Sequence, residues 1–380
     1  MEIFTGKYTI KQIIKEHWAN YLIKHPDVPD YIKKEVDKML ICRDPEKIGY
    51  LKYQCSDHYS EYVVIPFSCK SRFCNVCGVA QTNKWIDLTT TDLPNTSYIH
   101  VVFTIPDYLW YFFHKDQHRH LLDLLFKASS QTVLGWFESR GLKPGITSVL
   151  HTFGKQLNYN THIHCIVTAA GLGEDKDGNS VWKTIDTLPE VAMKKRWRAI
   201  LLTMLSDYID YSFKSMLFKK DWYVNIGIRL ITPKATCKYI GRYTKRPVIA
   251  ETRITDYDGT FITFFYIDKS EGYDKKVYCK LTWEEFITRL IQHIPKPYFK
   301  MIRHYGVFAN AVKNKYQKII FRLLNQTKKI SNWLKWRARH LKWKKVDPLI
   351  CKVCGKEMVL KELAFRSLYI NVLWVKRISF

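Results

Sequence analysis

The stretch NTHIHCIVTA, residues 160–169, constrains the fold of this 380-residue chain more than any other segment. Its apolar and β-branched residues predict a buried strand, on which successive side chains point to opposite faces. His162 and His164 therefore share one face, whereas Ile163 and Cys165 belong to the other. Two neighbouring imidazoles on a rigid strand offer two ligands to a divalent metal ion. About 0.4 such pairs are expected by chance in a chain with 13 His, so two core histidines are the alternative interpretation.

The segments around this strand predict an alternation of strands and helices. Strands are expected at 97–105, 146–153, 160–169 and 223–231, with helices at 118–139, 189–218 and 233–244. The order β-α-β-β-α-β is that of a ferredoxin-like sandwich, so the sequence predicts an α+β fold with an antiparallel sheet.

A third histidine is expected near the pair. If the second and third strands form a regular hairpin, His151 falls nearly opposite His164 and on the same face. His151 is therefore a candidate third metal ligand, or a partner that orients one of the other two. A core or loop histidine is the alternative, and Gln156, Asn158 or an acid from elsewhere in the chain remain open as ligands.

Cysteine pairs near the N-terminus predict a zinc site. The expected ligands are Cys55 and His58 together with Cys74 and Cys77, because the stretch between the two pairs alternates like a β-hairpin and would bring them together. No apolar run is long enough to span a bilayer and residues 1–20 lack a signal-peptide pattern, so a cytoplasmic protein with reduced cysteines is expected. A buried cluster of reduced thiols is the competing interpretation.

Four further cysteines leave the zinc ligands open. Cys42 and Cys69 could replace His58 in the ligand set, or they could support a second ion. Cys351 and Cys354 form one more C-x2-C knuckle near the C-terminus. This knuckle could complete a site with distant cysteines or with another chain, or be a remnant, and we assign it no role.

The helix expected at 233–244 carries a candidate nucleophile. Tyr239 and Tyr243 are four residues apart and therefore lie on one helical face, and next to them Arg242, Lys245 and Arg246 suit phosphate oxygens. With 24 Tyr, about 1.5 such pairs are expected by chance, so a basic helix with two core tyrosines is the alternative. In a β-α-β-β-α-β unit this helix can pack beside the central strands. A metal ion held by the histidines would then polarise a DNA phosphate that a tyrosyl oxygen attacks. The sequence therefore predicts DNA cleavage through a covalent 5′-phosphotyrosine.

The charge of the chain points to a polyanionic partner. Lys and Arg number 61 against 35 Asp and Glu, which gives a formal net charge of +26. Between residues 313 and 345 basic side chains alternate with tryptophans, a pattern that suits a DNA-backbone groove, with a solvated basic helix as the alternative. Three segments are expected: 1–90 with N-terminal helices and a zinc-ribbon-like DNA-binding domain, 95–310 with the catalytic domain, and 311–380 as a basic helical region with a CxxC knuckle.

Taken together, these motifs resemble a known family. H-x-H on a strand followed by Y-x3-Y on a helix resembles the signature of the HUH endonucleases. The surrounding sequence is similar to that of the two-tyrosine rolling-circle transposases of bacterial insertion sequences. The similar segments are HVVFTIP at 100–106, LHTFGKQLNYNTHIHCIVTAAGL at 150–172 and YIGRYTKRPVIAETRI at 239–254. That family carries an N-terminal cysteine-rich zinc domain, matched here by SCKSRFCNVCG at 68–78. The resemblance covers about 42–310.

The resemblance implies a function and its cofactors. It implies that His162 and His164 hold Mg²⁺ or Mn²⁺, that Tyr239 and Tyr243 are the nucleophiles, and that Zn²⁺ is bound in the N-terminal domain. The implied partner is DNA, mainly the single-stranded or hairpin ends of the protein's own mobile element, in a bacterial cytoplasm and without a membrane, with a homodimer as an open question. The family usually has C-x2-C where this chain has Cys55-Ser-Asp-His58. A rolling-circle replication initiator or relaxase, and a non-catalytic zinc protein that binds DNA, are the alternatives.

Overall fold

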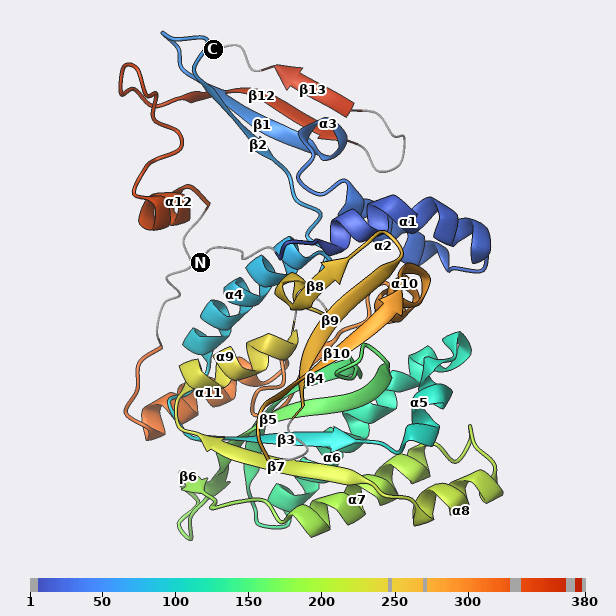
Figure 1. Ribbon diagram of the computed structural model, residues 1–380. Coiled ribbons are helices and arrows are strands. Elements are labelled where there is room, and N and C mark those ends of the chain that lie inside the picture. Colours follow the sequence, from blue (N-terminus) through green and yellow to red (C-terminus); the bar gives the residue numbers. More distant parts are fainter. Residues whose placement is uncertain (1–5, 245–247, 269–271, 329–335, 367–372, 378–380) are drawn as a thin grey trace. The chain divides into compact units, whose positions relative to one another are not determined.

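The computed structural model describes residues 6–244, 248–268, 272–328, 336–366 and 373–377. The chain forms two compact units, each assembled from segments that are distant in the sequence (Figure 1). The first unit contains residues 1–81, 249–294 and 332–380, and the second contains 82–248 and 295–331. The division therefore differs from the three consecutive segments expected from the sequence, because 249–294 and 332–380 pack with the N-terminal residues. The mixed α+β architecture with antiparallel sheets is as expected.

The second unit is built on one antiparallel sheet. Its strand order is β11-β4-β5-β3-β7, and β6 pairs with β5 beyond the residues of β5 that pair with β3. The strands are β3 (Tyr98–Thr104), β4 (Lys143–Phe153), β5 (Tyr159–Glu174), β6 (Ser180–Thr184), β7 (Tyr223–Leu230) and β11 (Ile302–Gly306). Along the chain, helices separate β3 from β4 and β5 from β7, whereas β4 and β5 form a hairpin.

Helices cover both faces of this sheet. They are α5 (Asp107–His114), the 3₁₀ helix η1 (Asp116–Leu121), α6 (Leu122–Glu138), α7 (Glu190–Met204), α8 (Tyr211–Lys219), α9 (Pro233–Thr244) and α11 (Lys313–Leu323). The single helix expected at 189–218 is divided into α7 and α8. The division occurs because Asp210 caps a new helix, its carboxylate accepting a hydrogen bond from the Phe213 amide at 2.8 Å.

The alternation of β5 separates the core from the histidines. Ile163 and Cys165 are fully buried in the main apolar core, which also contains Phe126 of α6 and Trp197 of α7. His162 and His164 belong to the opposite face. Figure 1 shows α7 on one side of the sheet and α9 on the other. The sheet therefore presents its histidine face toward the side on which α9 lies.

The first unit contains two smaller antiparallel sheets, with strand orders β13-β12-β1-β2 and β10-β9-β8. Its strands are β1 (Gly49–Gln54), β2 (Tyr62–Pro66), β8 (Ile254–Tyr257), β9 (Phe261–Asp268), β10 (Lys275–Thr282), β12 (Val359–Arg366) and β13 (Leu373–Arg377). Its helices are α1 (Ile10–Lys24), α2 (Asp30–Leu40), α3 (Pro45–Ile48), the 3₁₀ helix η2 (Glu251–Arg253), α10 (Trp283–Ile291) and α12 (Trp336–Lys344). Helix α4 (Asn75–Asp92) crosses the division between the units.

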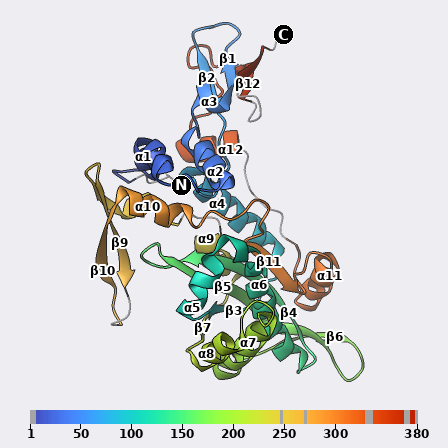
Figure 2. The same ribbon diagram turned by 90° about the vertical axis from the view of Figure 1, so that its right-hand side faces the viewer.

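The sequence predicted a helical C-terminal region, but this region also contains strands. Helices α11 and α12 are followed by strands β12 and β13, and β12 pairs with β1 (Figure 2). The strands form because of a pairing between distant segments of the chain. Strand β12 occupies the edge of β1 that β2 leaves unpaired, and its backbone groups form hydrogen bonds with those at that edge. In the part of the chain that the structure describes, no helix combines the length and the apolar character needed to cross a membrane.

Candidate active site and cysteine clusters

Strands β4 and β5 bring three histidines together. His151 on β4 lies directly opposite His162 on β5, and His164 is two residues further along the same face. One ring nitrogen from each of these three residues lies within 4.8 Å of the others. The structure therefore places in one group the three histidines singled out in the sequence.

The register of the hairpin differs from the expectation that His151 would lie nearly opposite His164. Residues 154–158 form the turn between β4 and β5, where the amide of Gly154 donates to the carbonyl of Asn158 at 3.0 Å. This turn is shorter than the one that would place His151 opposite His164. Because a shorter turn pairs residues closer to it, His151 moves from His164 to His162.

The surroundings of His162 and His164 favour their neutral imidazole forms. His151 and His164 are buried, with 3% and 7% of their surfaces exposed. Burial lowers the pKa of His162 to about 4 and holds the pKa of His164 well below its usual value. The Nδ1–H group of His162 donates a hydrogen bond to the carbonyl oxygen of Asn160 at 2.9 Å, which leaves the Nε2 lone pair available. A neutral imidazole with a free lone pair is the form that binds a metal ion.

A fourth histidine, His100 of β3, extends this group. Its Nε2 lies 2.9 Å from Nδ1 of His164, and the two rings are nearly parallel, with centroids 5.1 Å apart. Opposite His100, the pairing of β3 with β7 shifts register, and a Cβ atom added to Gly227 would lie 3.3 Å from Nδ1 of His100. His100 can therefore fix the orientation of the His164 ring through this hydrogen bond.

The sequence pattern alone does not single out His100. The alternation of β3 would have placed His100, Val102 and Thr104 on one face. The sequence did not predict that β3 pairs with β5. In this pairing Thr104 lies opposite His162 and His100 lies opposite Ile166.

Tyr239 and Tyr243 lie one turn apart on α9, as the sequence predicted. Their side chains and that of Arg242 are outside the described part of the structure, as are residues Lys245 and Arg246 altogether. The backbone of α9 contacts β4, β5 and β7. The helix that carries the two tyrosines thus packs on the strands that carry the histidines.

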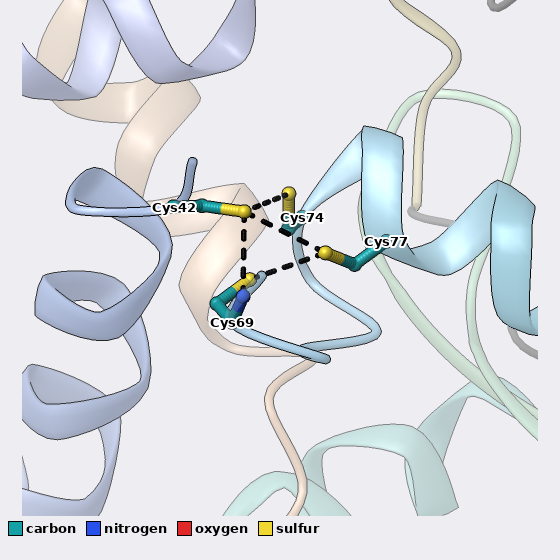
Figure 3. A group of neighbouring side chains, drawn as sticks. All are labelled: Cys42, Cys69, Cys74 and Cys77. Carbon is teal, nitrogen blue, oxygen red and sulfur yellow. Dashed lines mark hydrogen bonds between the residues drawn. The ribbon is translucent and has the colours of Figure 1, made fainter. Parts of the chain in front are cut away.

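Four buried cysteines form a compact cluster between the end of α2 and the start of α4 (Figure 3). The Sγ atom of Cys77 lies 3.5 Å from that of Cys69 and 3.6 Å from that of Cys42, and Cys42 and Cys74 are 3.9 Å apart. A tetrahedral zinc ion with Zn–S bonds near 2.3 Å requires S···S distances of about 3.8 Å. The four sulfur atoms are thus spaced as zinc ligands, and they are too far apart for a disulfide bond.

Hydrogen bonds within this cluster favour the thiolate form of Cys42 and Cys77, whereas the hydrogen bond with Cys42 raises the pKa of Cys69 and that of Cys74. The amide of Cys69 donates to Sγ of Cys42, and the amide of Ser71 donates to Sγ of Cys69, both at 3.4 Å. A hydrogen bond from the Cys69 thiol lowers the pKa of Cys42 to about 7. The neighbouring thiols, that of Cys42 first, also lower the pKa of Cys77. Thiolates are the form in which cysteines bind metal ions.

The quartet of Cys55, His58, Cys74 and Cys77 expected from the sequence is not assembled. Only one strand, β2, lies between the two pairs, because its hairpin partner β1 precedes Cys55. A five-residue strand spans about 17 Å, so β2 carries the chain away from Cys55 and His58 before it reaches Cys74. The alternates Cys42 and Cys69 join Cys74 and Cys77 instead, whereas Cys55 and His58 lie beside the C-terminal knuckle.

Comparison with known proteins gives the family. The family model "Transposase zinc-binding domain" matches residues 13–105, and the model "Putative transposase" matches 145–316. The transposase for insertion sequence element IS801 of Pseudomonas savastanoi pv. phaseolicola is 30% identical over 368 residues, which cover 90% of this chain and 86% of that protein. This chain belongs to the IS91 family of insertion-sequence transposases. As a transposase, it is a DNA-processing enzyme.

A second relative agrees with this family. "Putative transposase y4qJ" of Sinorhizobium fredii (strain NBRC 101917 / NGR234) is 24% identical over 323 residues, covering 79% of this chain and 80% of that protein. No solved structure matches the transposase. The cluster of Cys42, Cys69, Cys74 and Cys77 lies within the range of the zinc-binding domain, and the three clustered histidines lie within the range of the other model.

Proposed function

We propose that this transposase cleaves and rejoins single-stranded DNA at the ends of its element by tyrosine transesterification, in rolling-circle transposition. One observation carries the proposal: His151, His162 and His164 meet on one face of a sheet against which the helix of Tyr239 and Tyr243 packs. The chain order β-α-β-β-α-β with antiparallel pairing supports assignment of the second unit to the ferredoxin-like fold of HUH nucleases.

The proposed reaction exchanges one phosphate ester for another. The phenol oxygen of Tyr239 or Tyr243 attacks the scissile phosphorus, the bond between phosphorus and the 3′ oxygen breaks, and the phenol proton ends on that oxygen as a free 3′-OH. The 5′ end of the cleaved strand stays bound as a phosphotyrosine ester. Attack by another 3′-OH on this ester reverses the exchange and rejoins DNA without ATP. Two tyrosines on one helix allow two such linked cleavages by one chain.

The donor atoms of the histidine cluster fit a divalent metal ion. His151, His162 and His164 would hold the ion, and His100 would orient the ring of His164. Three neutral imidazoles suit Mn²⁺ better than Mg²⁺, which prefers oxygen ligands. When bound, the ion supplies Lewis-acid charge next to the scissile phosphate.

In the N-terminal part, the cluster of Cys42, Cys69, Cys74 and Cys77 would hold a structural Zn²⁺. This ion would fasten the end of α2 to the start of α4 and so stabilise a DNA-binding surface. The excess of basic residues supports a partner with an exposed phosphate backbone, and we propose that hairpin ends of the element are the natural substrate. The same proposal includes a homodimer, in which two chains act together on these ends.

The test is a covalent trapping experiment. Purified full-length protein is incubated with Mn²⁺ and a labelled single strand from the end of its own element, and the products are separated on a denaturing gel. We expect a protein–DNA adduct that EDTA abolishes and that is lost in Tyr239→Phe, Tyr243→Phe or both. Tyr211→Phe is the matched control, because Tyr211 of the same unit is 86% exposed and belongs to a different helix, α8.

The outcomes separate the alternatives. An adduct in Tyr211→Phe but not in the α9 variants supports tyrosine transesterification and names the first nucleophile. Tight, salt-sensitive DNA binding without an adduct under any metal contradicts the enzymatic proposal and favours a protein that only binds DNA.

A further inference from the structure

A second group of metal-binding residues lies in the first unit, outside the cluster of Figure 3. It joins the turn after β1 to the C-terminal knuckle: one ligand atom from each of Cys55, His58, Cys351 and Cys354 lies within 4.8 Å of the others. Cys55 and Cys354 are 299 residues apart in the sequence, but their sulfur atoms are 3.5 Å apart. The two halves of the group therefore come from opposite ends of the chain.

The spacing of these atoms is that of a tetrahedral zinc site. Nδ1 of His58 lies 3.8 Å from Sγ of Cys55 and 3.9 Å from Sγ of Cys351. Zinc with three sulfur ligands and one imidazole requires S···S distances of about 3.8 Å and S···N distances of about 3.6 Å. Cys55 and Cys351 are buried, and Met358 packs beside them.

Each half of the group is held by its own backbone hydrogen bonds. In the knuckle, the amide of Gly355 donates to the carbonyl of Cys351 at 3.0 Å, and Gly355 adopts a φ of +71°, which glycine accepts without strain. In the turn after β1, the amide of Cys55 donates to the carbonyl of Glu61 at 3.0 Å, and the amide of Glu61 donates to the carbonyl of His58 at 2.9 Å. Both loops thus present two ligands each in a fixed geometry.

The group stands at the end of a strand ladder. Gln54, the last residue of β1, pairs with Val359, the first residue of β12. Cys55 follows Gln54 directly, and the knuckle ends four residues before Met358. Next to it, Lys356 of the C-terminal segment forms an ion pair with Asp57 at 2.6 Å. A link at this point fixes which residues of β12 face which residues of β1.

We propose that Cys55, His58, Cys351 and Cys354 bind a second Zn²⁺ ion, and that this ion fastens the C-terminal strands to the N-terminal hairpin. The chemistry of the donors selects zinc among common divalent ions, because three thiolates and an imidazole in a tetrahedral arrangement form a closed structural site. Neither the transesterification proposed above nor the identity of its metal ion enters this inference. The proposal gives the C-terminal knuckle a role that one pair of cysteines could not have alone.

Zinc content of the purified full chain, measured by elemental mass spectrometry, tests the stoichiometry. We expect at least two zinc ions per wild-type chain, and one fewer in the double variant Cys351→Ser with Cys354→Ser. Cys279→Ser is the matched control, because Cys279 of β10 is half-buried in the same unit and belongs to neither cysteine cluster. His58→Cys should keep the full count, because a thiolate replaces the imidazole, whereas His58→Ala should lose zinc.

Alkylation of the wild-type protein tests the same site without any substitution. Cys354 and Cys279 are both half-buried. With zinc bound, N-ethylmaleimide should label Cys279 but not Cys354, and a chelator should expose Cys354 and Cys351 to labelling. Hydrogen exchange of the β12 amides should then rise at least tenfold.

Three results would overturn the proposal. They are fewer than two zinc ions per wild-type chain, an unchanged zinc count in the folded Cys351/Cys354 double variant, and labelling of Cys354 in the zinc-loaded protein. A double variant that does not fold leaves the wild-type count and the alkylation pattern as the deciding measurements.

Discussion

At the scale of single residues, the histidine cluster depends on burial and on hydrogen-bonded neighbours. Burial lowers the pKa of His100 and that of His162 to about 4, which keeps both rings neutral at neutral pH. The hydrogen bond between His100 and His164 then decides which nitrogen of His164 carries its proton. If Nδ1 of His164 donates to His100, Nε2 of His164 is left as a metal ligand.

We predict that His100→Ala weakens Mn²⁺ binding by about 10- to 100-fold, because the ring of His164 loses the partner that orients it. Isothermal titration calorimetry with Mn²⁺ measures the change. His100→Gln should restore part of the affinity, since its amide can accept the same hydrogen bond. His120→Ala, an exposed histidine of the same unit, serves as the control. Unchanged Mn²⁺ affinity together with a lowered melting temperature would mean that His100 has only a packing role.

At the scale of elements, short-range signals set the ends of helices. Thr282 caps α10: its hydroxyl accepts a hydrogen bond from the amide of Glu285 at 3.2 Å, and the carboxylate of Glu285 accepts one from the amide of Thr282 at 3.0 Å. This capping box positions a helix whose Phe286, Ile287 and Leu290 are fully or almost fully buried. A cap of this kind acts within four residues, so the sequence alone reveals it.

We predict that Thr282→Ala lowers the free energy of unfolding of the first unit by about 1 kcal/mol, because the amide of Glu285 loses its acceptor. Urea unfolding followed by circular dichroism measures the loss. Thr282→Ser keeps the hydroxyl and should remain close to the wild type. Equal losses in the two variants would show that the methyl group, not the hydrogen bond, stabilises this end of α10.

At the scale of the whole molecule, the net charge of +26 governs the encounter with DNA. Each phosphate that a lysine or arginine neutralises releases a bound counterion, so binding weakens as salt rises. The charge is spread along the sequence, and basic residues occur in helices of both units, for example Lys194 on α7 and Lys342 on α12.

We predict that affinity for a single strand falls at least about tenfold between 50 and 200 mM salt, with a linear relation between the logarithms of affinity and salt concentration. Fluorescence anisotropy with a labelled strand from the element end measures the slope. A strand of unrelated sequence should show a similar slope, because the phosphate backbone is common to both. Affinity that does not change with salt would contradict an interface built on phosphate contacts.

The sequence by itself determined the local features of this transposase. The alternation of β5 predicted which residues face the core, and the order of strands and helices predicted an α+β fold with an antiparallel sheet. These features depend on periodicity and on contacts within a few residues, which the order of amino acids states directly. The proximity of His151 to the histidine pair followed from the hairpin for the same reason. The register of the hairpin differs from the prediction, because His151 lies opposite His162 and not opposite His164.

Only the tertiary structure decided the groupings that join distant segments. It placed His100 beside His164 through the pairing of β3 with β5, and it gave Cys74 and Cys77 the partners Cys42 and Cys69. It also carried the C-terminal strand β12 to β1, next to Cys55. A cysteine or histidine carries the same chemistry wherever it lies, so residue type identifies candidate ligands but not their partners. The partners are set by strand pairing and packing between segments that are tens to hundreds of residues apart, for which spacing along the chain provides no measure.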